Sequence, residues 1–160
     1  MIFEVQYDSP VGPLTVASDG EVLIGLRFAP STRETGTVPV LTEACRWLDG
    51  YFSGNAPSPR ILPLAPAATA FQALVREILL DIPFGRSMTY GEVARLAARR
   101  LGKARMSAQA VGNAVGANPL PVIVPCHRVL ASGGRLGGFS SGPDLKRRLL
   151  ELEHIPVVLP

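Results

Sequence analysis

Two adjacent side chains in the second half of the chain can do chemistry together. Cys126 and His127 follow the apolar run Val122–Val124, which we predict to be a short strand because prolines bound it on both sides. A thiol beside an imidazole and the Arg128 guanidinium has neighbours that favour the thiolate, the nucleophilic form of cysteine. The alternative is a buried and inert cysteine, the commoner fate of this residue. The pattern therefore marks Cys126 as a candidate nucleophile and leaves its reactivity open.

A carboxylate on the last predicted helix supplies a third member of the group. That helix begins at Gly142-Pro143, with proline in its first turn. Glu153 falls inside the apolar arc of the helix, where a carboxylate needs a partner or must lose its charge. Lys146 also falls near the arc, but its long stem is expected to carry the ammonium to water. His127 is the histidine sited to meet Glu153, so a Cys–His–Glu relay is a physical hypothesis. The arc itself consists of Leu145, Leu149, Leu150 and Leu152.

The elements that must position these groups fall into two halves. Residues 2–28 predict a small antiparallel sheet, because short β-rich runs alternate with the turn segments 9–13 and 18–20. Residues 41–52 predict a helix whose apolar stripe includes Cys45, which we expect in the core. Four prolines in residues 54–66 predict an extended linker between two domains, 1–65 and 66–160. The remaining stripe residues are Leu41, Leu48 and Phe52.

The second half predicts helices with clear starts. Capping boxes at Thr69-x-x-Gln72 and Thr89-x-x-Glu92 open two amphipathic helices. A third helix, from about Ser107 to Val115, consists almost entirely of small residues. Two short helices about a tight turn resemble a helix-turn-helix, and small side chains let a backbone approach a partner surface. A helix packed tightly on its own core is the alternative.

Composition and charge limit the classes of protein to which this chain can belong. The chain has 160 residues, of which 47% are hydrophobic and 18% charged, and this excludes a disordered solvating chain. Two cysteines are too few for a disulfide framework, which favours a reducing compartment. The first twenty residues contain no basic residue and are not expected to be a secretory signal. Residues 106–127 carry no formal charge, but their prolines and polar side chains argue against a membrane span.

The net charge of +3 is unevenly divided. Residues 1–65 carry four basic and seven acidic side chains, whereas residues 66–160 carry twelve basic and six acidic ones. The C-terminal half, at a net +6, is therefore the half expected to meet a polyanion.

Taken together, these motifs resemble one family closely. Pro125-Cys-His-Arg-Val129, with Asn118-Pro119 upstream and Gly137-Gly-Phe-Ser140 downstream, resembles the O6-alkylguanine-DNA alkyltransferases. The resemblance covers nearly the whole chain and extends to Ile82-Pro-Phe-Gly85. It implies a ribonuclease-H-like α/β N-terminal domain followed by a mainly α, winged-helix-like C-terminal domain with a helix-turn-helix. It also implies direct-reversal repair, in which an alkyl group passes once and irreversibly from O6 of guanine to a cysteine after base flipping.

Roles follow from the resemblance residue by residue. Cys126 would be the alkyl acceptor, His127 the base acting through a water, and Glu153 its orienting carboxylate. Asn118 would brace the active-site turn, and Tyr90 would help to rotate the damaged nucleotide out of the duplex. The guanine pocket would be lined by Val129, Phe139 and Ser140. The residues expected to contact DNA are Ser107, Gln109, Ala110, Gly112 and Arg128.

The transfer chemistry requires no cofactor, and the N-terminal half has no cysteine–histidine cluster, so no structural zinc site is expected. The expected partner is double-stranded DNA carrying O6-alkylguanine, with no membrane involved, and the expected state is a monomer, with assembly on DNA left open. The expected location is the cytoplasm, on the nucleoid.

Two departures from the family pattern stand out. Gln109 occupies the place of the family's usual arginine, so it lacks the charge and the planar fork of that side chain. The stretch between Tyr90 and Gln109 is about five residues longer than usual, around the basic segment 99–105. Its cations either contact phosphate and partly offset the missing arginine, or belong to a tolerated surface insertion.

Other classes of function remain as alternatives. A non-enzymatic relative would bind the lesion and flag it for other repair proteins, but such relatives lack the acceptor cysteine. A regulator that senses alkylation through Cys126 and a thiol hydrolase are further alternatives, although no oxyanion arrangement is evident for the latter.

Overall fold

The computed structural model describes residues 1–33 and 35–158, which form two compact units. The first unit comprises residues 1–66 together with 119–123, and the second comprises 67–118 and the chain from Val124 onward. The sequence-based boundary after residue 65 leaves 119–123 in the second domain, whereas the contacts of this segment place it in the first. The chain therefore returns briefly to the first unit just before Cys126.

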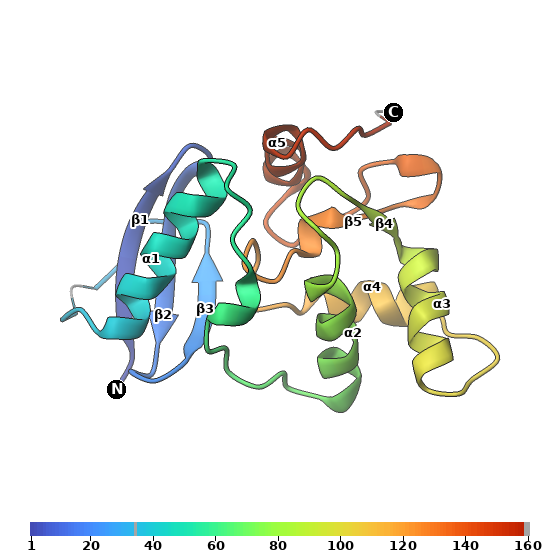
Figure 1. Ribbon diagram of the computed structural model, residues 1–160, viewed down its shortest axis with the longest axis horizontal. Coiled ribbons are helices and arrows are strands. Elements are labelled where there is room, and N and C mark those ends of the chain that lie inside the picture. Colours follow the sequence, from blue (N-terminus) through green and yellow to red (C-terminus); the bar gives the residue numbers. More distant parts are fainter. Residues whose placement is uncertain (34, 159–160) are drawn as a thin grey trace. The chain divides into compact units, whose positions relative to one another are not determined.

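The first unit is a three-stranded antiparallel sheet with one helix on it. The strands β1 (Phe3–Ser9), β2 (Gly12–Ser18) and β3 (Leu23–Arg27) lie in the order β1-β2-β3, as predicted. Figure 1 shows α1 (Pro39–Phe52) lying across one face of this sheet. Gly12 makes the tight connection between β1 and β2 with a φ of 107°, a conformation that side chains with a Cβ rarely adopt.

The buried face of α1 differs from the predicted stripe. Leu41 and Leu48 are buried as expected, but Cys45 and Phe52 are only half-buried. The centre of the face is shifted toward Trp47 and Tyr51, whose rings stack with centroids 5.7 Å apart. The large aromatic rings bury more apolar area than a cysteine does, so they determine how the helix is rotated.

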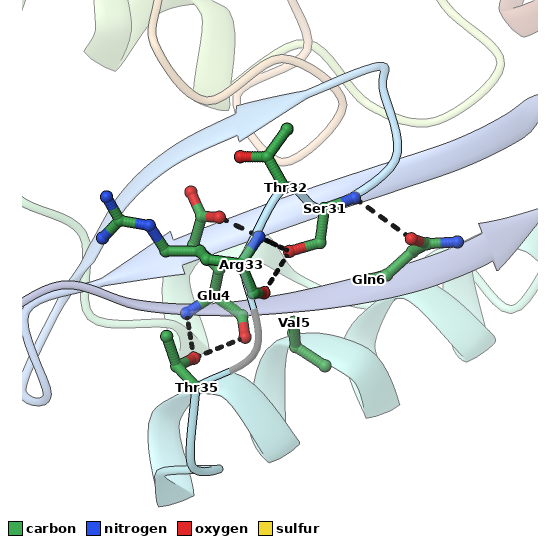
Figure 2. Close-up of a pocket in the computed structure, with 7 residues that line it drawn as sticks. All are labelled: Glu4, Val5, Gln6, Ser31, Thr32, Arg33 and Thr35. Atoms are coloured by element: carbon green, nitrogen blue, oxygen red, sulfur yellow. Dashed lines mark hydrogen bonds between the residues drawn. The ribbon is translucent and has the colours of Figure 1, made fainter.

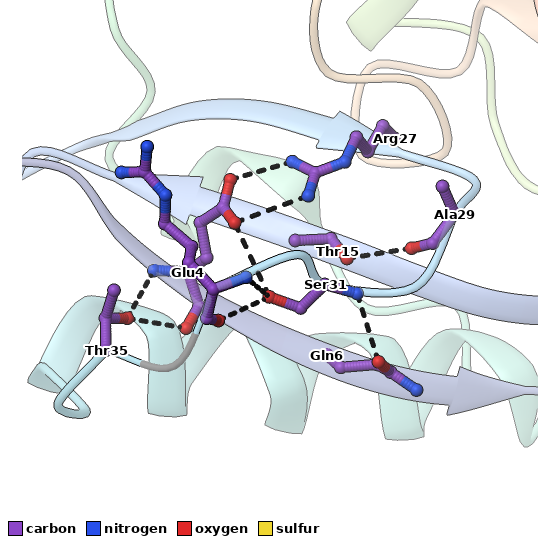
Figure 3. Close-up of polar contacts among 8 residues, drawn as sticks. Glu4, Gln6, Thr15, Arg27, Ala29, Ser31 and Thr35 are labelled. Carbon is purple, nitrogen blue, oxygen red and sulfur yellow. Dashed lines mark hydrogen bonds and ion pairs between the residues drawn. The ribbon is translucent and has the colours of Figure 1, made fainter.

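Both outer edges of the sheet are covered. On β1, the Glu4 backbone N–H donates to Thr35 Oγ1 at 2.7 Å, and the Thr35 hydroxyl donates back to the Glu4 carbonyl at 2.9 Å (Figure 3). On β3, the Leu23 N–H donates to the Pro63 carbonyl at 2.8 Å and the Leu26 N–H donates to the Pro119 carbonyl at 2.9 Å. The proline-rich segment is therefore partly a sheet cover and not only a linker. Bonds of this kind reduce the number of edge groups that could pair with another chain.

The second unit is mainly helical. It contains α2 (Ala70–Leu80), α3 (Tyr90–Arg100), α4 (Ala108–Gly116) and α5 (Pro143–Leu152). The first three begin where the sequence predicts, at the N-caps Thr69, Thr89 and Ser107. At Thr89 both hydrogen bonds of the capping box are formed, and at Thr69 the side chain accepts the Gln72 N–H. Within residues 1–33 and 35–158, no helix has the length and apolar character needed to cross a bilayer.

A small parallel pair of strands joins the start of α3 to the segment that follows Cys126. β4 (Met88–Thr89) pairs with β5 (Val129–Leu130), which brings Tyr90 into the neighbourhood of the cysteine motif. The strand predicted at Val122–Val124 is wrong, because residues 122 and 123 form a turn in which Val122 has a φ of 74°. Three aliphatic residues between two prolines are too few to form a paired strand, and the flanking prolines favour the turn.

Candidate active site

Cys126 opens a single turn of 3₁₀ helix, Cys126–Arg128, that is fixed by backbone hydrogen bonds. The Cys126 N–H donates to the Val124 carbonyl at 2.7 Å, and the Arg128 N–H donates to the Pro125 carbonyl at 3.0 Å. The Asn118 amide nitrogen donates to the same Val124 carbonyl at 3.0 Å. This hydrogen bond links Asn118, for which the resemblance implies a bracing role, to the residue two positions before Cys126. Cys126 itself is 4% exposed.

Glu153 lies in the middle of a group of donors. Its carboxylate accepts hydrogen bonds from His127 Nε2, from Arg128 Nε at 2.8 Å and Nη2 at 3.2 Å, and from the Gly85 N–H at 3.0 Å. The Glu153 side chain is 0% exposed, so its carboxylate is shielded from bulk solvent. An ionised carboxylate only accepts, and this places the histidine proton on Nε2. The predicted meeting of His127 and Glu153 is therefore present, with Nδ1 left as the other ring nitrogen for proton transfer.

The charges of this group follow from its surroundings. Burial raises the pKa of the Glu153 carboxyl, but the hydrogen bonds and charges of His127 and Arg128 outweigh burial and hold the pKa at about 2. Burial also lowers the pKa of His127 against the opposing pull of Glu153, so the imidazole is neutral at pH 7. A neutral imidazole beside an ionised carboxylate is able to take a proton.

The thiol needs such a base. Burial raises the pKa of Cys126 to about 11, although a hydrogen bond from Asn118 and the charge of Lys146 both oppose the rise. At neutral pH the sulfur is therefore protonated in the resting site. The expectation that neighbouring cations alone favour the thiolate is incomplete, because the cost of desolvating the thiolate is larger than their attraction.

Lys146 has a role that sequence analysis missed. Its side chain is 0% exposed, whereas we expected the ammonium to reach water. Nζ instead donates to the Val129 carbonyl at 2.6 Å and to the Gly138 carbonyl at 3.1 Å, and it lies 5.6 Å from the centre of the Tyr90 ring. Burial lowers its pKa to about 8. The sequence did contain an indication that Lys146 is buried, because this residue falls near the apolar arc of α5. The same helical periodicity indicated that Glu153 is buried.

Cys126 lines a pocket of about 340 Å³. Two residues expected to form the guanine site, Phe139 and Ser140, line it, and so does Tyr90. The Tyr90 hydroxyl donates to the Gly138 carbonyl at 3.4 Å, so Tyr90 and Lys146 hold the same backbone group. Val129 is buried, and its carbonyl is engaged by Lys146. The lining as a whole consists of Tyr90, Gly112, Val115, Gly116, Cys126, Gly138, Phe139 and Ser140.

The residues expected to contact DNA are found in different surroundings. Ser107 and Gln109 are exposed at the start of α4, next to the half-buried Ala110, and the Ser107 hydroxyl caps the helix by accepting the Ala110 N–H. Gly112 lines the pocket. Arg128 has a side chain only 8% exposed, because its guanidinium turns inward to Glu153 and to the Ile82 carbonyl at 2.7 Å. The structure therefore gives Arg128 a positioning role inside the protein.

A second hollow, of about 590 Å³, lies in the first unit between β1 and the segment that follows β3 (Figure 2). Several of its lining residues bond one another; for example, the Ser31 backbone N–H donates to Gln6 Oε1 at 3.0 Å. Its lining contains neither cysteine nor histidine. In the described part of the chain, no group of three histidine, cysteine or acidic side chains is arranged to hold a metal ion.

Comparison with known proteins identifies the family. The model of the 6-O-methylguanine DNA methyltransferase ribonuclease-like domain matches residues 2–66, and that of the DNA binding domain matches residues 70–155. The methylated-DNA–protein-cysteine methyltransferase of Mycobacterium tuberculosis strain H37Rv is 41% identical over 159 residues, covering 96% of this chain and 93% of the relative. The protein of the same name from Haemophilus influenzae is 36% identical, covering 98% and 89%.

Solved structures agree with this assignment. The Mycobacterium tuberculosis OGT in complex with DNA superposes with a TM-score of 0.78 at 40% identity, covering 92% of this chain and 90% of that one. The O6-methylguanine DNA methyltransferase from Methanococcus jannaschii gives a TM-score of 0.61 at 27% identity, covering 99% and 95%. The predicted α/β domain followed by a mainly helical domain is thereby confirmed. Because both domain models match in order and the relatives cover nearly its full length, the chain belongs to the 6-O-methylguanine DNA methyltransferase family.

Proposed function

We propose that this protein repairs duplex DNA by taking the alkyl group from O6 of an alkylated guanine onto Cys126, once per molecule. The observation that carries the proposal is that Cys126 lines the 340 Å³ pocket while its neighbour His127 is bound to the buried Glu153. In the reaction the carbon–O6 bond breaks and a carbon–sulfur bond forms. A thioether has no leaving group for hydrolysis, so the protein is consumed.

The proton of the thiol follows a route through the site. His127 takes it through a water molecule, as the family resemblance implies, with Nδ1 as the accepting nitrogen because Nε2 is committed to Glu153. The ionised Glu153 stabilises the imidazolium, which passes the proton to the departing guanine so that the normal base is restored. The thiolate is thus formed only as it reacts, which suits a sulfur whose pKa is raised to about 11 by burial.

The substrate base must leave the duplex to reach the sulfur. O6 is inside the base stack, and extruding a nucleotide costs about a few kcal/mol. We propose that α4 lies against the DNA with Gln109 near the place of the extruded base, and that Tyr90, Phe139 and Ser140 receive the guanine. The proposed state is a monomer on DNA inside the cell, where thiols are kept reduced.

The proposal is tested by the mass of the protein after reaction. Incubation with a duplex oligonucleotide containing O6-methylguanine is expected to add one methyl group, located on the peptide that contains Cys126. The Cys45→Ala variant is the matched control and should gain the same mass, because Cys45 lies on α1 outside the pocket. Cys126→Ala should gain none. A wild-type protein that binds the lesion without gaining mass would contradict the proposal and support a non-enzymatic lesion-binding protein.

The residues of α4 that line the pocket predict how large an alkyl group the pocket accepts. Gly112 and Gly116 lie one turn apart on α4, and a Cβ built on either would meet no atom within 4 Å. Pockets that bury drug-sized molecules are roughly 300–1,000 Å³, so this pocket has room for a purine with more than a methyl substituent. Gly116→Val is therefore expected to slow transfer from O6-benzylguanine roughly tenfold more than transfer from O6-methylguanine.

This expectation is best measured on the free bases, so that DNA binding does not enter the rate. Ala108→Val, on the exposed first turn of α4, is the control and should leave the ratio of the two rates unchanged. An equal slowing of both bases by Gly116→Val would show that this wall does not select alkyl size.

A further inference from the structure

The basic segment, residues 99–105, forms an exposed surface between α3 and α4. Arg99 and Arg100 end α3, and Lys103 and Arg105 follow in the connection to α4; all four are exposed. Figure 1 shows this connection as a loop that projects from the end of α3. The exposed surface continues into Ala108 and Gln109 at the start of α4.

The charges of the basic segment are not used by the fold. Arg100 pairs with Asp81 at 3.5 Å, a surface contact of little energetic value. Across residues 1–33 and 35–158, Arg99, Lys103 and Arg105 have no ion-pair partner. Neighbouring like charges repel one another, so three unpaired cations in seven residues lower stability slightly. The fold therefore gains no stability from these three charges.

The backbone of the segment is held without these charges. Gly102 adopts a φ of 66°, and the Lys103 N–H donates to the Ala98 carbonyl at 2.8 Å, which ends α3 in an ordered turn. The cations therefore project from a defined turn. Their substitution is expected to leave the helices on either side intact.

The segment leads directly into the helix that faces the proposed ligand. Arg105 precedes the N-cap Ser107 by two residues, a span of at most about 7 Å along the chain. The N-terminus of α4 carries a partial positive charge of its own, which favours anions. Cations and helix terminus therefore share one exposed surface within the region that matches the family's DNA binding domain.

We propose that Arg99, Lys103 and Arg105 bind the phosphodiester backbone of the duplex on which α4 lies, and so replace part of the affinity that an arginine at position 109 would supply. This rests on the proposed function, because it requires α4 to lie on DNA. Each contact neutralises one phosphate and releases condensed counterions. The contacts are independent of base sequence, as a search for rare lesions requires.

The test is the salt dependence of DNA binding. In a Cys126→Ala background, which prevents consumption of the protein, Kd is measured for an O6-methylguanine duplex between about 50 and 200 mM salt. Substituting Arg99, Lys103 and Arg105 together by glutamine is expected to reduce the slope of log affinity against log salt by about 0.9 per lost contact, or about 2.7 for three. The single Lys103→Gln variant should lose about one third of this.

Two controls separate this inference from the proposed function. Arg33→Gln with Arg46→Gln removes two exposed charges from the first unit and should leave the slope unchanged. With Cys126 intact, the triple variant should react with free O6-methylguanine at the wild-type rate, since the pocket is untouched. The inference is overturned if the triple variant has the wild-type salt slope, or if the Arg33→Gln, Arg46→Gln control changes the slope equally. Either result would leave the proposed methyl transfer to Cys126 unaffected. A wild-type protein that neither binds the duplex nor gains a methyl group overturns the proposed function itself.

Discussion

Replacing Glu153 with glutamine is expected to destabilise the protein by about 3–5 kcal/mol and to slow alkyl transfer at least about 10²-fold. The substitution keeps the size of the side chain but turns one acceptor oxygen into a donor, which then faces the donors of His127 and Arg128. The buried guanidinium loses its counter-charge, and the imidazolium formed in the reaction loses its stabilising carboxylate. Thermal unfolding and single-turnover rates measure the two effects.

Glu151→Gln is the matched control, because Glu151 is exposed in the last turn of α5, just before Glu153 at the C-cap. It is expected to leave the stability and the rate near wild type. Equal values for the two variants would mean that Glu153 supports neither the fold nor the base.

The same carboxylate predicts how stability depends on pH. The pKa of Glu153 is held at about 2 in the folded protein, below its ordinary value of 4.5. Its contribution is therefore fully present above about pH 4.5 and is lost as the pH falls toward 2, an effect of about 3 kcal/mol. Acid unfolding of Glu153→Gln should show a correspondingly weaker loss over this range.

Replacing His127 with glutamine is expected to lower the transfer rate at neutral pH by roughly 10²–10⁴-fold. In the wild type, the rate should be nearly constant through neutral pH and fall in acid, where the imidazole becomes protonated at a pKa below its ordinary 6.5. Without the imidazole, the thiol must lose its proton to hydroxide, so the rate should climb with pH toward the thiol pKa of about 11. The measurement is the pH profile of methyl transfer under single-turnover conditions.

The other histidine provides the control for this experiment. His154 is exposed, and its backbone has a φ of 59°, so His154→Asn keeps a residue that tolerates this conformation. It should reproduce the wild-type profile. A flat profile in His127→Gln would show that the proton leaves the sulfur by another route.

The core of the site was predictable because its signals are local. A carboxylate inside a leucine arc is recognisable from helical periodicity alone, and a cysteine beside a histidine needs no tertiary information. The inward direction of Arg128 and the burial of Lys146 were not predictable in this way. Long side chains can reach water or turn inward, and the carbonyls that capture Lys146 belong to Val129 and Gly138, which the fold brings together.

In the fold, too, features with local sequence signals were predictable and features that depend on tertiary contacts were not. Capping residues mark the starts of α2, α3 and α4 correctly because the cap bonds join residues three positions apart. The rotation of α1 and the turn at Val122 depend on the surface against which each segment packs. An apolar run of three residues between prolines has no periodicity from which a strand and a turn can be distinguished.

The path of the chain has a consequence for whether the two halves can be separated. The chain leaves the first unit after residue 66, returns at 119 and leaves again after 123, three residues before the nucleophile. The two units cannot be separated by dividing the chain at one position. A break after residue 66 would remove the hydrogen bond between the Leu26 N–H and the Pro119 carbonyl. It would also expose Leu120 and Ile123, which are both 0% exposed in the whole chain. The segment that leads into Cys126 is therefore held in part by β3, in a unit that contains none of the groups placed in the site. We expect a protein that begins at residue 67 to expose Leu120 and Ile123 to water.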